Sequence, residues 1–232
     1  KTWKKLNGNG LPDGELGRIS VAVSPVAPYT TYALIESEKT ALYRSDDNGS
    51  NWEMTNNGPA VVERPFYFSN ITPDTQEPNR VYKPGFILQV SDDGGKTFSG
   101  SAVEGGNYHV DLHAFWIAPT NNRLMYLGTD GGVYVSNDKG NTWNFLQNLP
   151  LSQFYHVATD QQKPYNVYGG VQDNGSWMAP SQSAGGITNA DWKSVGFGDG
   201  FNAFPDKQDD NILYWQWQGG NIVRYYKKTG EF

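Results

Sequence analysis

The sequence predicts an all-β protein built from repeated strand–turn–strand units, and two observations carry that prediction. The motif SDDNGSNW begins at Ser45 and returns as SDDGGKTF at Ser91 and as SNDKGNTW at Ser136. A motif that recurs every 45 or 46 residues is typical of a repeat architecture. The 232 residues also include 27 Gly, 13 Pro and 14% aromatic residues, but only 18% charged ones. That composition favours strands and tight turns over helices.

Composition also narrows the partners and cofactors. The formal charge of −6 argues against a nucleic-acid partner, which would need a basic face. The chain has no cysteine, which excludes a disulfide framework and a zinc–thiolate site. No run of about eighteen apolar residues is present, so we expect no membrane partner. Neither a nucleic acid nor a membrane is therefore an expected partner.

Each copy of the motif follows an apolar strand and ends on a large aromatic residue. The Asp at its third position can accept hydrogen bonds from backbone N–H groups inside the turn. The Gly two residues later can adopt the positive φ that the turn needs, and the closing aromatic ring can pack into a core. The Asp residues could instead be catalytic or bind a metal, but what recurs in every unit is usually scaffold. These structural residues are Asp47, Gly49 and Trp52, then Asp93, Gly95 and Phe98, then Asp138, Gly140 and Trp143.

The pattern S-x-D-x-G-x-T-W resembles the Asp-box, or BNR repeat, of β-propellers. That resemblance implies four-stranded blades in which the Asp-box joins the third strand to the fourth. Apolar runs that precede the motif extend the count to five repeats, the last two with degraded or missing boxes. We expect one propeller domain, or part of one, with repeats at about 17–63, 64–108, 109–150, 151–197 and 198–232.

Both ends of the chain look incomplete in terms of this repeat. Residues 1–6, KTWKKL, resemble the tail of an Asp-box, and the last stretch, GNIVRYYKKTGEF, is typical of a third strand without its fourth. Residues 1–6 could close the last blade of a five-bladed ring. Alternatively, the chain is an arc of a larger propeller protein, with further blades or domains as partners. We favour the arc, because a cut between repeats leaves unpaired edge strands of this kind.

Longer segments extend the resemblance. HVDLHAFWIAP, LPLSQFYHVATDQQKPYNVYGGVQDNGSW and GFGDGFNAFPD are similar to segments of large bacterial Asp-box proteins related to sortilin-type propellers and to xyloglucan-cleaving glycoside hydrolases. The resemblance implies a protein that is secreted, periplasmic or on the bacterial cell surface, with a ligand-binding face. The fold does not decide the activity. A module that binds a glycan or polypeptide is the main hypothesis, and a xyloglucanase-like hydrolase with two carboxylates, or half of one, is the alternative.

In a propeller, the loop before each first strand and the turn after each second strand lie on one face, opposite the Asp-box turns. Polar and aromatic residues at those positions differ from repeat to repeat, so the repeat itself does not require them. We predict that they bind the ligand around one channel mouth. These residues are Arg18, Arg64, His113, Asp130, Trp215 and Trp217. The two tryptophans share one face of a strand and could either stack on sugar rings or belong to the blade core.

Three further aspartates are candidate catalytic groups. Asp173, in GGVQDNGSW, and Asp199, in GFGDGF, each lie between glycines, and such small neighbours let a ligand approach closely. Either could pair with Asp111 as acid and base across a glycosidic bond, at a separation of roughly 5–9 Å. The alternative is that Asp173 and Asp199 are ordinary turn residues.

The stretch HVDLH suggests a possible metal site. On a strand, His109, Asp111 and His113 would point to the same side. That arrangement could hold Ca²⁺ or another divalent cation, or form a His–Asp acid/base pair. A hydrogen-bonded polar cluster is the alternative, because three ligands from one strand rarely surround one ion. We expect no cofactor to be required.

Overall fold

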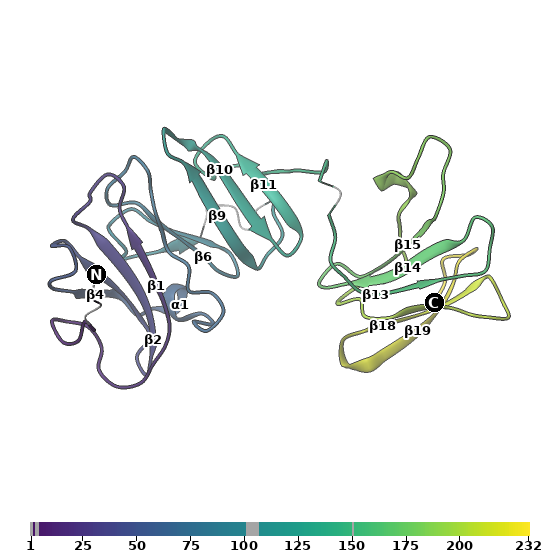
Figure 1. Cartoon of the computed structure of the whole chain (residues 1–232), viewed down its shortest axis with the longest axis horizontal. Coiled ribbons are helices and arrows are strands. Elements are labelled where there is room, and N and C mark those ends of the chain that lie inside the picture. Colours follow the sequence, from purple (N-terminus) through teal and green to yellow (C-terminus); the bar gives the residue numbers. More distant parts are fainter. Residues whose placement is uncertain (1, 3–4, 101–106, 150) are drawn as a thin grey trace. The chain divides into compact units, whose positions relative to one another are not determined.

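The computed structural model describes residues 2, 5–100, 107–149 and 151–232, and nearly all its regular structure is β-strand (Figure 1). The chain divides into two compact units, Lys1–Leu146 and Gln147–Phe232. None of the helices in this part of the chain is long and apolar enough to cross a membrane.

The first unit contains three four-stranded antiparallel sheets, and in each the strands lie side by side in chain order. The first sheet joins β1 (Leu16–Val23), β2 (Thr31–Ser37), β3 (Ala41–Ser45) and β4 (Glu53–Asn56). After the short helix α1 (Pro59–Val62), the second joins β5 (Thr72–Pro73), β6 (Val81–Pro84), β7 (Leu88–Ser91) and β8 (Ser99–Gly100). The third joins β9 (Leu112–Ala118), β10 (Asn121–Thr129), β11 (Gly132–Ser136) and β12 (Asn144–Phe145).

The second unit contains two more sheets of the same kind. The fourth sheet joins β13 (Phe154–Thr159), β14 (Asn166–Val171), β15 (Ser176–Pro180) and β16 (Lys193–Ser194), with a 3-10 turn η1 (Asn189–Asp191) before its last strand. In the described residues the fifth sheet has three strands, β17 (Ala203–Pro205), β18 (Ile212–Trp217) and β19 (Asn221–Tyr226), with the 3-10 turn η2 (Gln218–Gly220) between the last two.

The predicted fold class is confirmed: the chain is all-β, and its successive antiparallel sheets are β-propeller blades. The one-domain organisation and its repeat bounds stay predictions. So does closure of the fifth sheet by residues 1–6, of which residues 1, 3 and 4 lie outside the described part of the chain.

The apolar cores lie between successive sheets, and strand alternation explains why. Neighbouring residues of a strand point to opposite faces. Val81 of β6 therefore joins a cluster with the first sheet, whereas Tyr82 joins a cluster with the third. The cluster between the first two sheets contains Tyr32, Leu34, Leu42, Val61, Ile71 and Val81. In the second unit, Tyr168, Val195, Ala203, Leu213 and Trp215 form the cluster between the fourth and fifth sheets.

The three motif copies fold into equivalent turns, which we call the serine–aspartate turns (residues 45–49, 91–95 and 136–140). In the second, Ser91 Oγ accepts the Gly95 N–H at 2.8 Å and donates to Asp93 Oδ1 at 2.8 Å. Asp93 Oδ1 also accepts the Thr97 N–H at 2.9 Å, and Gly95 has φ +87°. The other two turns repeat these contacts from serine and aspartate. These contacts support the predicted structural role of the turns, which stays a prediction.

The closing aromatic rings are buried to different extents. Trp143 is buried in the cluster between the second and third sheets, whereas Trp52 and Phe98 are only partly buried. Trp52 packs with Leu11 on the face of the first sheet that points away from the second. The rings therefore serve as core residues, but only Trp143 is enclosed.

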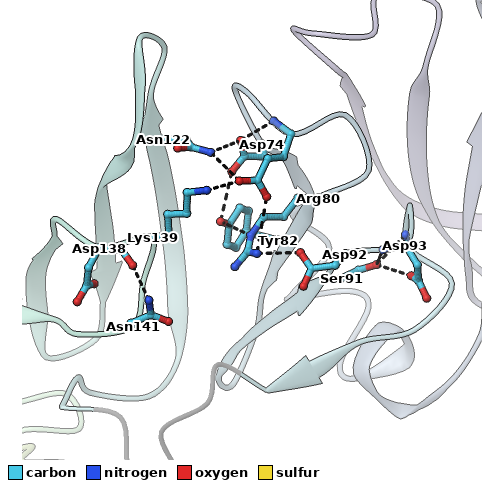
Figure 2. A network of polar contacts seen from close by, with 12 residues as sticks. Asp74, Arg80, Tyr82, Ser91, Asp92, Asp93, Asn122, Asp138, Lys139 and Asn141 are labelled. Carbon is cyan, nitrogen blue, oxygen red and sulfur yellow. Dashed lines mark hydrogen bonds and ion pairs between the residues drawn. The ribbon is translucent and has the colours of Figure 1, made fainter.

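A polar network joins the second and third sheets near the serine–aspartate turns (Figure 2). The buried carboxylate of Asp74, where β5 ends, accepts hydrogen bonds from Tyr82 Oη at 3.3 Å and Asn122 Nδ2 at 2.9 Å. Lys139 of the third turn pairs with Glu77. The Asn122–Asp74 and Lys139–Glu77 contacts cross from the third sheet to the second, so they help to fix the spacing of these two sheets.

Candidate functional site

Asp111 lies directly before β9 in an uncommon backbone conformation. Its φ is +61°, a left-handed value that few residues other than Gly adopt. Its N–H donates to Phe86 O at 3.1 Å, and its carbonyl accepts the Asp130 N–H at 3.2 Å. Backbone strain of this kind tends to gather at functional sites. The loop before a first strand and the turns after two second strands therefore meet at Asp111.

The carboxyl group of Asp111 is unusual among the described residues. Its Oδ1 is buried without a hydrogen-bond partner. Burial, followed by the nearby negative charge of Asp130, raises the pKa of Asp111, while Arg64 and His113 oppose the rise. A carboxyl group that holds its proton more tightly than usual is suited to donate that proton to a leaving group.

His113, in β9, connects Asp130 to an aromatic side chain. Its Nε2 lies 2.8 Å from Asp130 Oδ1 and 3.5 Å from Tyr67 Oη. The rings of Tyr67 and His113 meet edge to face, with centroids 5.1 Å apart. We refer to Arg64, Tyr67, Asp111, His113 and Asp130 as the Asp111 site.

Of the two predicted arginines, Arg64 belongs to the Asp111 site and Arg18 supports it. Arg64 has φ +40°, is exposed, and partly offsets the charge of Asp111. Arg18 Nη1 donates to Phe66 O at 3.3 Å and to Tyr67 O at 3.5 Å. Arg18 therefore holds the segment that carries Tyr67, whereas Arg64 acts on Asp111 directly.

Three exposed aromatic rings, one of them that of Tyr67, lie at this site, and the sequence argument did not select them. Phe66 is 64% exposed, and Tyr67 and Phe86 are each 43% exposed. Phe66 and Tyr67 follow Arg64, while Phe86 accepts the Asp111 N–H through its carbonyl. The signal that could have found two of them is the run FYF directly after Arg64 and a proline, ahead of a strand.

In the second unit, the structure brings Asp173 and Asp199 together. Asp199 Oδ1 accepts the Asp173 N–H at 2.8 Å, and Asp199 Oδ2 accepts Gln218 Nε2 at 2.8 Å. Asp173 has φ +56°, so it repeats the strained backbone of Asp111. The pairing of either residue with Asp111 stays a prediction.

The tryptophans of β18 have different positions. Trp215 is 1% exposed and lies in the core between the fourth and fifth sheets. Its predicted role as a ligand contact is therefore wrong, because its face of β18 points inwards. Trp217 is partly buried and packs against Phe197, with ring centroids 5.2 Å apart, and Phe197 is itself 48% exposed. The ligand-binding role of Trp217 stays a prediction.

The metal site predicted from HVDLH is not formed. Strand β9 begins only at Leu112, and the left-handed backbone of Asp111 breaks the alternation that was to place His109, Asp111 and His113 on one side. His109 Nδ1 instead lies 3.0 Å from Val110 O. In the described part of the chain, no group of three or more His, Asp or Glu side chains is arranged to hold a metal ion.

Comparison with known proteins gives one curated relative. No family model matches the chain. An oligoxyloglucan-reducing end-specific xyloglucanase from Emericella nidulans is 26% identical over 175 residues, covering 64% of this chain and 20% of that protein. The chain thus spans about a fifth of its relative's length.

Solved structures show weaker likeness. The GH74 enzyme of Niastella koreensis is 15% identical with a TM-score of 0.45, over 90% of this chain and 38% of that one. The GH74 xyloglucanase of Xanthomonas campestris is 14% identical with a TM-score of 0.44, over 89% and 38%. YCF48 from Cyanidioschyzon merolae is 15% identical with a TM-score of 0.39, over 94% and 83%. The chain thus consists of β-propeller blades, as its sheets show, and its sequence is similar to part of a xyloglucanase.

Proposed function

We propose that the chain is a propeller part of a glycoside hydrolase that cleaves a β-linked glycan of the xyloglucan class, with Asp111 as the proton donor. The observation that carries this proposal is that Asp111 Oδ1 is buried and has no hydrogen-bond partner. Burial and the charge of Asp130 also raise the pKa of this carboxyl group. The similarity to a curated xyloglucanase supports the choice of glycan.

In this proposal, the two carboxylates of the Asp111 site have different roles. Asp111 gives its proton to the glycosidic oxygen as the bond to the anomeric carbon breaks. Asp130 lies against His113 and, through its charge, favours the protonated form of Asp111. The mechanism also needs a second carboxylate, which either activates the water that attacks the anomeric carbon or attacks that carbon itself.

The exposed rings next to the Asp111 site supply a binding surface. The C–H faces of a sugar ring pack on aromatic side chains, and a few polar groups then fix its orientation. Phe66, Tyr67 and Phe86 offer such rings beside Arg64. We propose that they hold successive sugar units so that one glycosidic oxygen lies at Asp111.

The proposal also includes the identity of the scaffold and the place where the protein acts. The serine–aspartate turns are proposed to be Asp-boxes, and the contacts that their serine, aspartate and glycine share support this identity. The protein acts outside the bacterial cytoplasm, where polysaccharides of this class occur.

A glycan-binding module without turnover is the second candidate, favoured by Asp199, whose two oxygens are both engaged by hydrogen bonds from its own chain.

The test compares Asp111→Asn with the native chain on xyloglucan oligosaccharides, with new reducing ends and calorimetric binding as the two readouts. Asn tolerates the positive φ of residue 111, so the fold should be retained. Turnover should disappear while binding persists. The matched control is Asp92→Asn, an exposed carboxylate of the serine–aspartate turns, which should change neither.

Unchanged turnover in Asp111→Asn would contradict the assignment of the proton donor. Absence of turnover in the native chain, together with binding that Phe66→Ala weakens, would favour the binding module.

A further inference from the structure

Lys83, in β6, is a charged residue at a position that the neighbouring sheets fill with apolar ones. Lys83 pairs across the sheet with Gln89, which lies two residues before Ser91. Ala33 in the first sheet and Leu127 in the third pair with the residue at the same place before their own serine–aspartate turns, so the three positions are equivalent. All three are buried, with Lys83 and Leu127 both 0% exposed. Burial of an ammonium group costs free energy that a leucine would not cost. The packing of the sheets therefore does not explain why a lysine occupies this position.

The ammonium of Lys83 lies close to one carboxylate. Its Nζ has no hydrogen-bond partner and is 3.9 Å from Glu63 Oε2 and 5.9 Å from the centre of the Phe68 ring. A Cβ at Gly85 would come within 2.7 Å of Lys83 Nζ and 3.0 Å of Glu63 Oε2. Gly85 thus leaves room for the pair. Burial lowers the pKa of Lys83, and Glu63 opposes that shift.

The Lys83–Glu63 pair lies directly behind the Asp111 site. Glu63 Oε2 accepts the Phe86 N–H at 3.1 Å, and Phe86 O accepts the Asp111 N–H. The Phe68 ring packs against the His113 ring, with centroids 5.8 Å apart. Between Glu63 and Phe68 runs the segment that carries Arg64 and Tyr67. The pair therefore contacts both ends of that segment.

We propose that Lys83 is a positioning residue of the Asp111 site. Its ammonium holds Glu63, and through Glu63 it holds residues 63–68 so that Arg64 faces Asp111 and Tyr67 faces His113. The inference rests on the proposed function only in taking the Asp111 site as the functional one, and it does not depend on the ligand. Loss of the ammonium should let Arg64 move away from Asp111, whose carboxyl group would then hold its proton more tightly.

The test is Lys83→Met in the full chain, followed by carbon NMR titration of the Asp111 carboxyl group, amide chemical shifts of residues 63–68 and thermal unfolding. No glycan is used, so failure here is distinct from failure of the hydrolase proposal. Methionine fits an apolar core position and removes a buried charge, so the melting temperature should not fall. The titration midpoint of Asp111 should rise by roughly half a pH unit or more, and the signals of Arg64 and Tyr67 should move.

Two further variants make the result decisive. Leu127→Met introduces the same residue at the equivalent position of the third sheet and should leave the Asp111 midpoint in place. Glu63→Gln keeps an oxygen for the Phe86 N–H but removes the charge, and should raise the midpoint as Lys83→Met does. It also answers the question if Lys83→Met does not fold. The proposal would be overturned if the titration midpoint of Asp111 stayed unchanged in Lys83→Met. If Lys83→Met does not fold, an unchanged midpoint in Glu63→Gln would overturn it.

Discussion

His113 Nε2 lies 2.8 Å from Asp130 Oδ1, and the two residues come from opposite ends of one hairpin, the start of β9 and the turn after β10. The contact lies at an irregularity of the register, because Thr129 pairs with Leu112 and Gly128 with Ala114, which leaves His113 without a partner on β10. The same turn places Asp130 beside Asp111. One hairpin thus carries an imidazole and two carboxyl groups, and the turn after β6 also holds Asp111 through the hydrogen bond from its N–H to Phe86 O.

Replacement of Asp130 by Asn should lower the pKa of Asp111. The negative charge of Asp130 is one of the causes that raise this pKa, so its removal leaves burial as the main cause. Carbon NMR titration of the Asp111 carboxyl group measures the effect. The control is Asp92→Asn, since Asp92 pairs with Arg80 on the opposite side and should leave Asp111 unchanged. A midpoint that stays the same in Asp130→Asn would show that burial alone governs Asp111.

Replacement of Ser91 by Ala should destabilise the chain by roughly 1–3 kcal/mol, since a buried N–H then loses its acceptor. Ser91 is 1% exposed, and its Oγ accepts the Gly95 N–H and donates to Asp93. Urea unfolding measures the change, with the exposed Ser99 of β8, replaced by Ala, as the control. Ligand binding should be unaffected. A loss of binding at unchanged stability would mean that this turn is a site and not a scaffold.

Stability should fall in acid between pH 3.8 and about 2, because of the serine–aspartate turns. The Asn51 N–H, followed by its side chain, lowers the pKa of Asp47 to about 2. For Asp93, burial acts to raise the pKa, but the hydrogen bonds from Thr97 and Ser91 together have the larger effect and lower the pKa to about 2. A carboxyl group with a depressed folded-state pKa stabilises the fold above its unfolded pKa, and that stabilisation disappears as pH falls through the folded pKa.

The measurement is the free energy of unfolding in urea at several pH values from about 5 to about 2. Asp93→Asn should give a shallower decline than the native chain over this interval. Equal slopes would show that the turns do not drive acid unfolding.

Replacement of Trp215 by Ala should cost roughly 3–5 kcal/mol of stability, as for other large aromatic residues in cores. Trp215 is 1% exposed and shares its core with Tyr168 and Leu213. Trp217→Ala should cost less, because that ring is only partly buried. Chemical denaturation followed by circular dichroism distinguishes them. A small loss for Trp215→Ala, together with weaker glycan binding, would restore the stacking role that its burial argues against.

Replacement of Asp199 by Ala should speed amide hydrogen exchange at Asp173, because Asp199 Oδ1 is the acceptor of that N–H. Gln218→Ala removes the other contact of Asp199 but leaves this hydrogen bond, and so provides the control. Exchange at Asp173 that is equally slow in both variants would mean that neighbouring backbone, and not the carboxylate, protects the amide.

The scaffold was predictable from the sequence because its determinants are local and repeated. Serine, aspartate and glycine within five residues specify each turn, and the interval between turns leaves room for one four-stranded sheet. Placement of Arg64 and Asp130 near Asp111 also followed from where loops of this fold meet. None of these inferences required knowledge of side-chain packing.

The parts of the site that were missed or misjudged depend on backbone exceptions and on burial. Alternation along HVDLH fails because Asp111 is left-handed, and no residue pattern announces that conformation. Trp215 and Trp217 look alike in sequence, but only the docking of the fifth sheet on the fourth encloses Trp215. Lys83 is visible only once sheets are aligned residue by residue, because a lysine in a strand ordinarily points to water.

The location of the apolar clusters between sheets has a consequence for how the first unit folds. Among the described residues, the two clusters between sheets of this unit each join adjacent sheets, so their contacts join residues separated by little more than one repeat. In such a chain, folding can nucleate at any adjacent pair and spread outwards, as in one-dimensional repeat arrays. Contact order then stays low for an all-β protein, and we expect the first unit to fold faster than sandwich proteins of equal length, whose strands must find partners far along the chain.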